Sequence, residues 1–277
     1  MPSRISRRFS SLPGFGLSLG ITILWLSLIV LIPLSAVFVK SGSEGWGTFW
    51  AAAASPRALA AYRLSFGAAA LAAMINCIFG LLVAWVLVRY RFVGRRLFSA
   101  LIDLPFALPT AVAGIALTAL YANTGLIGRK FAALGIPIAY RPAGVVVALV
   151  FIGLPFVVRT VEPVLAQASS EVEEAALTLG ATRIQTFSRV VLPSIAPALA
   201  TGFALAFARG AGEYGSVIFI AGNVPYKSEI APLLIITQLE EYNYAGATAI
   251  ACVMLLISFA VLLLLGMAQH WQHRRIA

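Results

Sequence analysis

The chain has 277 residues, of which 61% are hydrophobic and only 11% are charged, and its mean hydropathy is +0.95. This composition excludes a soluble domain of the same size and indicates an integral membrane protein. The net charge is +10. We interpret it mainly as the lysines and arginines that orient a membrane protein, rather than as a surface for nucleic acid.

Apolar windows of about 20 residues, long enough to cross about 30 Å of hydrocarbon, follow one another along the chain. We place six of them, at 17–39, 64–88, 100–121, 143–162, 196–220 and 245–268. The first is about twice as long as the apolar core of a signal peptide, so we expect a retained helix. The sequence therefore predicts an all-α, polytopic membrane protein with six transmembrane helices and no soluble catalytic domain.

The basic residues predict the orientation, because loops rich in lysine and arginine stay in the cytoplasm. With a cytoplasmic N-terminus, the arginine clusters at 4–8, 89–96, 183–189 and 274–275 all fall on the inner side. We therefore expect both termini in the cytoplasm, together with the connection between the fourth and fifth spans. Asp103, at the start of the third span, is expected to be an interfacial residue near Arg95 and Arg96.

A polar segment between the fourth and fifth spans carries its own helix signals. Ser170 and Glu173 have the spacing of a capping box, and Gly180 suits the left-handed residue that ends a helix. The helix between them is too short to be stable without a surface to lie against. It has one apolar stripe, formed by Val172, Ala175, Ala176 and Leu179.

A second helix signal follows at once. Thr182 and Gln185 have the capping-box spacing, and Pro193 is expected to end this helix. Its apolar stripe consists of Ile184, Phe187, Val190 and Val191. The sequence thus predicts two short helices joined by a turn, on the cytoplasmic side and in need of a partner.

Arg209 and Glu213 lie in the predicted fifth span, four residues apart and so on one helix face. Charges at this depth are costly and usually face a bundle interior or a wet cavity. One interpretation is a self-neutralising pair that fixes helix packing. The other is that the pair lines or gates a path, with Arg209 helping an anion to cross.

Sequence signals for enzymatic chemistry are missing. The chain has no P-loop, no Ser-His-Asp set and no G-x-S-x-G motif, so any ATP must be bound by another subunit. His270 and His273 have no carboxylate or thiol at ligand spacing, and we expect neither a metal nor a cofactor. This disfavours a membrane enzyme and leaves transport.

The polar segment resembles the E-A-A-x3-G-x9-I-x-L-P signature of type I ABC-importer permeases. The matching residues are Glu174, Ala175, Ala176, Gly180, Leu192 and Pro193, and valine replaces isoleucine at 190. The resemblance implies that this loop, at about 163–195, couples the membrane path to a cytoplasmic ATPase. It also implies a permease domain at 60–268, after an N-terminal tail (1–16) and a first helix with its periplasmic loop (17–59), and before a C-terminal tail (269–277).

Four further stretches look like the T-type permease subunits of sulfate/thiosulfate importers, namely 89–92, 103–114, 155–161 and 212–223. That resemblance implies an inner-membrane heteromer with a second related permease, two copies of an ATP-binding subunit and a periplasmic sulfate- or thiosulfate-binding protein. Molybdate permeases share part of the pattern and are the alternative within transport. A stand-alone channel or scaffold is the alternative of another class, and the partnerless polar helices argue against it.

Overall fold

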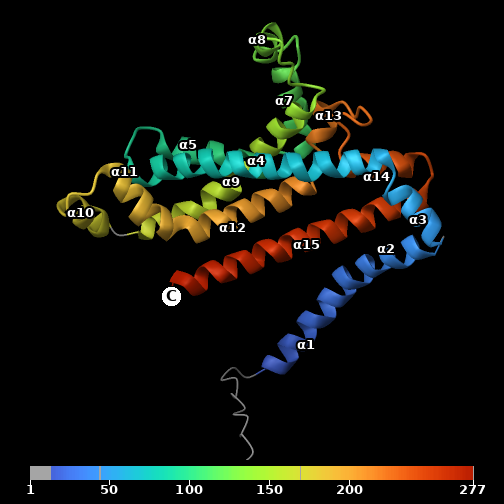
Figure 1. The fold of residues 1–277 in the computed structure, drawn as a ribbon, viewed down its shortest axis with the longest axis horizontal. Coiled ribbons are helices and arrows are strands. Elements are labelled where there is room, and N and C mark those ends of the chain that lie inside the picture. The colour runs from blue at the N-terminus through green and yellow to red at the C-terminus, as the bar shows by residue number, and fades with distance from the viewer. Residues whose placement is uncertain (1–13, 44, 169, 277) are drawn as a thin grey trace, which may run out of the picture.

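The computed structural model describes every residue except 1–13, 44, 169 and 277 (Figure 1). Within the described residues the regular structure is helical and contains no strand, which confirms the all-α fold. In the described part of the chain, five helices are long and apolar enough to cross a membrane: Phe15–Gly42, Pro56–Arg89, Pro142–Gln167, Arg183–Ala211 and Tyr244–Met267. They match five of the six predicted spans.

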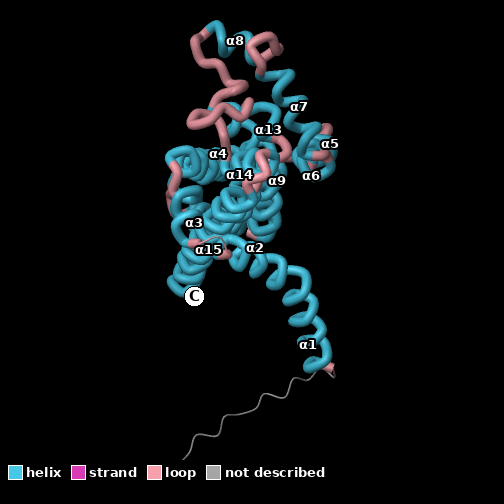
Figure 2. The backbone as a smooth tube through the Cα atoms, turned by 90° about the vertical axis from the view of Figure 1, so that its right-hand side faces the viewer, coloured by secondary structure: helices cyan, strands magenta, loops and turns pink. Residues whose placement is uncertain are grey.

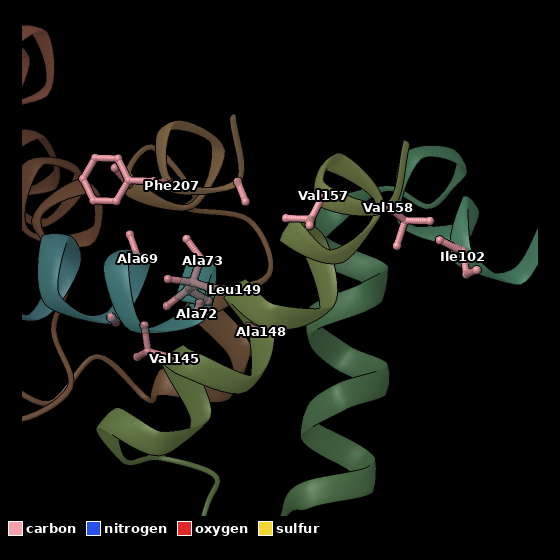
Figure 3. Packing of buried hydrophobic residues seen from close by; sticks show 14 of the residues in the cluster. Ala69, Ala72, Ala73, Ile102, Val145, Ala148, Leu149, Val157, Val158 and Phe207 are labelled. Atoms are coloured by element: carbon pink, nitrogen blue, oxygen red, sulfur yellow. The ribbon is translucent and has the colours of Figure 1, made fainter. Parts of the chain in front are cut away.

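Three helices form the centre of the bundle, namely α4 (Pro56–Arg89), α9 (Pro142–Gln167) and α12 (Leu192–Ala211). Around them lie α14 (Ala231–Glu240), α15 (Tyr244–Ile276), α3 (Trp46–Ala53) and the first span, which is α1 (Phe15–Leu26), the π-helical turn η1 (Ser27–Leu31) and α2 (Ile32–Gly42). Alanines at 69, 72 and 73 on α4 pack near Val145 and Ala148 of α9 (Figure 3).

Glycines bring the three central helices close together. A Cβ on Gly80 of α4 would lie 2.8 Å from Cγ1 of Val157, and a Cβ on Gly202 of α12 would lie 3.0 Å from Cα of the same valine. Close backbone approach through small residues is how membrane helices gain packing energy, since lipid offers no hydrophobic drive between them.

The predicted third span is divided into α5 (Arg95–Ile102), α6 (Leu104–Ala107) and α7 (Thr110–Tyr121). Leu108, just before Pro109, is extended, with φ −80° and ψ 135°. A residue before proline is pushed out of the helical region, and here this ends α6. Beyond the break, α7 and α8 (Gly128–Ala133) project from the bundle, as the two views agree (Figures 1 and 2).

The polar connection forms α10 (Ser170–Thr178), α11 (Arg183–Thr186) and the π-helical turn η2 (Phe187–Val191). Our expectation that the second short helix ends near Pro193 was wrong, since α11, η2 and α12 continue as one helix to Ala211. A proline is tolerated in a membrane helix when local π-helical geometry re-satisfies the backbone groups that it frees. The first span has the same arrangement, with η1 just before Pro33.

The expected position of Asp103 near Arg95 and Arg96 was also wrong. Its carboxylate accepts a hydrogen bond of 2.8 Å from Nε of Arg159 on α9, and a second guanidinium nitrogen bonds the Ser99 hydroxyl, also at 2.8 Å. Two nitrogens of the Arg159 guanidinium donate to the two oxygens of this carboxylate, the bidentate geometry that makes such a pair strong. Arg159 thereby attaches α5 and α6 to the bundle.

Another ion pair lies at the N-terminal end of α4. The guanidinium of Arg57 donates to both carboxylate oxygens of Glu229, at 2.8 and 2.7 Å, and Glu229 is only 2% exposed. Glu229 immediately precedes Ile230 and α14, so the pair joins the start of α4 to the start of α14. Figure 1 shows α14 and α3 at the end of the bundle away from α10 and α11.

Candidate functional site

The predicted end of the first polar helix is confirmed at Gly180. This residue has φ +87°, and its N–H donates to the Leu177 carbonyl at 3.0 Å. The next N–H, of Ala181, donates to the Ala176 carbonyl at 3.0 Å. These two bonds make a Schellman cap, the motif that requires a left-handed residue.

The predicted cap of the second helix is also confirmed. Oε1 of Gln185 accepts from the Thr182 N–H at 2.8 Å, and Oγ1 of Thr182 accepts from the Gln185 N–H at 3.3 Å. The Ser170 cap of the first helix lies outside the side chains that the structure describes. Both short helices thus have ends defined by local hydrogen bonds, with only the turn at 179–182 between them.

The apolar stripe of α10 is uncovered. Val172 is 55% exposed and Leu179 is 88% exposed, and Ile184 on α11 is 80% exposed. Glu174 and Ala175 are exposed beside them, and Ala176 is half-buried. The segment therefore presents a small apolar face, flanked by the exposed residues Glu171 and Glu174, which no other described part of the chain covers.

Glu173 holds the other side of α10 to the bundle through an ion pair with Arg89, the last residue of α4. The Arg89 guanidinium also lies 5.6 Å from the ring centroid of Trp85, within the range of a cation–π contact. Trp85 in turn meets Phe187 of η2 edge to face at 5.6 Å. The sequence reading assigned Glu173 only to a cap and missed this contact.

Leu192 and Pro193, the end of the signature, lie at the start of α12 and not in a turn. Leu192 packs against the core, while Pro193 is exposed in the first turn of α12. Together with Glu174, Ala175, Ala176 and Gly180, they mark the end of the bundle that carries α10.

Arg209 and Glu213 form the expected ion pair. However, α12 ends at Ala211, so Glu213 lies past the helix rather than on its face. Glu213 is 2% exposed, and its Oε1 accepts from the Ser216 N–H at 2.9 Å and the Ser216 hydroxyl at 3.0 Å. Its carboxylate therefore fixes the turn into α13 (Val217–Ala221) while pairing with the arginine. The Arg209 side chain stays 35% exposed.

The break after α12 lies against the break before α7. A Cβ on Gly215 would lie 2.1 Å from the Thr110 hydroxyl, and a Cβ on Gly114 would lie 2.4 Å from the Ser216 carbonyl oxygen. Non-helical backbone at membrane depth is tolerated only inside protein or beside a wet cavity. The meeting of two broken segments next to Arg209 is the arrangement that transporters use around a substrate.

A family model described as "Binding-protein-dependent transport system inner membrane component" matches residues 76–277. The sulfate transport system permease protein CysT of Synechocystis sp. is 48% identical over 99% of this chain and 96% of its own length. The protein of the same name from Escherichia coli is 48% identical over 96% of this chain and 96% of its own length.

Solved structures share the fold. A crystal structure of a bacterial ABC transporter involved in the import of the acidic polysaccharide alginate gives a TM-score of 0.75, at 16% identity over 92% of this chain and 94% of that one. An inward-facing MetNI methionine ABC transporter gives 0.56, at 18% identity over 78% and 94%. These likenesses concern the fold alone.

The Arg89–Glu173 contact predicts how α10 is held. Glu173→Lys places a cation beside Arg89, so we expect limited proteolysis within 168–182 to become about two- to fivefold faster, as suits a partly exposed pair. The exchanged pair, Arg89→Glu with Glu173→Lys, should restore most of the resistance. Glu174→Lys, at an exposed neighbouring position, is the matched control. Equal cleavage of all these proteins would contradict the tether.

Proposed function

The chain belongs to the family of binding-protein-dependent transport system inner membrane components, and on this premise we propose that it is the permease subunit of an ABC importer for sulfate and thiosulfate. The observation that supports sulfate as the substrate is the 48% identity to sulfate transport permeases over 99% and 96% of the chain. The protein crosses the membrane several times. Its termini and α10 are proposed to lie in the cytoplasm, with a permease domain at 60–268.

The proposed partners follow from the family. They are a second related permease, two copies of a cytoplasmic ATPase that supplies the hydrolysis of ATP, and a periplasmic binding protein that delivers the anion. One solved relative of the same fold is an alginate transporter in complex with a substrate-bound periplasmic protein. This chain would itself contribute to the membrane path and supply the helix that links the path to the ATPase.

Uptake of labelled sulfate tests the function directly. The chain is expressed with its partner subunits in a host that lacks its own sulfate importer, and uptake of sulfate, thiosulfate and molybdate is compared. We expect uptake of the first two that stops without the ATPase. Import of molybdate alone would show that molybdate, and not sulfate, is the substrate. Flux that persists without the ATPase would indicate a channel.

We infer that α10 and α11 are the docking element for the ATPase. The exposed stripe of Val172, Ala175 and Leu179 supports this, because a short helix with an uncovered apolar face is stable only against a partner. Glu174 beside the stripe provides a charge that can pair across the interface. The opposite face carries Glu173, which is paired with Arg89 of α4. A displacement of α10 by the ATPase would therefore be transmitted to the bundle.

Gly180 tests the docking element. Gly180→Val should cost about 1–2 kcal/mol in the left-handed conformation, so we expect less co-purified ATPase and less uptake, with normal membrane insertion. Gly180→Asn is the matched control, because asparagine accepts this conformation. Glu174→Lys should also weaken the contact. Normal ATPase binding and uptake in both the valine and lysine variants would rule out docking at this segment.

Arg209 is proposed to line the path of the anion. Its side chain is 35% exposed and lies beside the two helix breaks. It carries a positive charge within a predicted span, where an unpaired dianion is expensive. Glu213 holds it in place while bonding Ser216. A purely structural pair, which only neutralises itself, is the competing explanation.

Charge removal separates the two explanations. Arg209→Gln alone leaves the buried carboxylate of Glu213 unpaired, which costs about 3–5 kcal/mol and should lower the amount of folded protein. Glu213→Gln alone leaves the partly exposed Arg209 unpaired, so it should lower that amount less. The double variant should recover folding yet import little, because the path has lost its cation. Arg209→Lys, which keeps the charge, should retain part of the uptake. Full uptake by the double variant would leave only the structural role.

A further inference from the structure

A cavity of about 230 Å³ separates the inner face of α10 from the bundle. Its lining comes from α4, α10, α11 and η2, namely Trp85, Glu173, Leu177, Arg183, Thr186, Phe187 and Val191. The helix α10 packs mainly on α11 and η2, with Glu173 reaching past them to Arg89. The helix α10 of the docking element therefore lies over a cavity and is not packed closely against α4.

The cavity has a positive polar side. Its one carboxylate, Glu173, is neutralised by Arg89, while Arg183 is exposed and has no carboxylate partner among the residues that the structure describes. The Thr186 hydroxyl is buried, with the residue 6% exposed, and it too lacks a hydrogen-bond partner in the described part of the chain. A spare guanidinium and an unsatisfied hydroxyl together suit an anion with several acceptor oxygens.

An apolar groove of about 530 Å³ continues from the same place along α4 and α12. The two spaces adjoin at Trp85 and Phe187, which line both of them and meet edge to face. The rest of the groove is lined by Cys77, Ile78, Leu81, Leu82, Leu192 and Leu199. Ile78 is 62% exposed and Leu82 is 56% exposed, so the groove opens sideways, in the apolar part of the bundle.

We propose that an anionic phospholipid occupies these two adjoining spaces, with its headgroup phosphate in the cavity beside Arg183 and Thr186 and an acyl chain in the groove between α4 and α12. The order of groups matches a lipid, since the cationic cavity lies at the helix ends, Trp85 at the level typical of interfacial aromatic residues, and the aliphatic groove deeper. Basic pockets between spans on the cytoplasmic side bind anionic headgroups.

The position gives the lipid a role. Its headgroup would fill the space under α10 and contact Leu177 on that helix, so the segment that docks the ATPase would be braced by a molecule of the bilayer. This role rests on the proposed function, whereas the binding itself does not. The test therefore measures lipid, not sulfate.

The experiment uses the full chain co-expressed and purified with its partner subunits. The complex is incubated with phosphatidylglycerol or phosphatidylcholine, and the lipid retained per complex is measured by mass spectrometry. We expect selective retention of phosphatidylglycerol. Arg183→Gln should lower it about fivefold, the effect of one basic residue at a membrane surface. Leu82→Trp should lower it by filling the groove.

Two variants are the matched controls. Arg189→Gln removes an arginine from the same continuous helix as Arg183, and Leu71→Trp changes a leucine of α4, the helix that carries Leu82. Both residues are exposed, and neither lines the cavity or the groove. They should retain lipid like the unchanged complex.

Four results would overturn the proposal. Equal retention of the two lipids, or full retention by Arg183→Gln, would mean that the cavity does not select the headgroup. Displacement of bound lipid by inorganic phosphate at matched concentration would indicate a site for free anions. A cysteine introduced by Ile78→Cys should react with a thiol reagent dissolved in the membrane. If it instead crosslinks to the second permease, a protein covers the groove.

Discussion

The close packing of α4, α9 and α12 is the constraint on which the rest of the structure depends. Lipid is as apolar as a leucine side chain, so helices in a bilayer associate through contact area rather than through exclusion of water. Gly80 and Gly202 let both neighbours approach Val157, and the alanines of α4 continue the same contact along α9. Polar contacts attach several of the shorter elements to this unit.

The attachments are polar, and each sits where a helix ends or breaks. Arg159 holds α5 and α6 through Asp103, Glu213 holds the turn into α13, and Glu173 holds α10. Within hydrocarbon, a backbone group released by a break must find a partner inside the protein. The side chains that supply those partners therefore mark the places where the bundle departs from simple spans.

The sequence predicted features that depend on local rules. The Schellman glycine at 180, the Thr182–Gln185 box and five spans follow from neighbouring residues alone, and the structure has them. The break at Pro109 follows a local rule for the residue before a proline, although the apolar window did not show it. The break after Ala211 and the helix that continues through Pro193 depend on what packs beside them, so periodicity did not predict them. Asp103 and Glu173 were assigned sequence neighbours as partners, because distant arginines such as Arg159 and Arg89 become neighbours only after folding.

The helix α4 differs from the other two central helices in having no proline beyond its first turn, whereas α9 contains Pro155 and Pro163 and α12 contains Pro197. Its 34 residues form a rod of about 51 Å. Each end is clamped by an ion pair, Arg57 with Glu229 and Arg89 with Glu173. A rod without a hinge transmits displacement instead of absorbing it. Motion imposed at one face of the membrane would therefore arrive at the opposite face as a rigid-body shift.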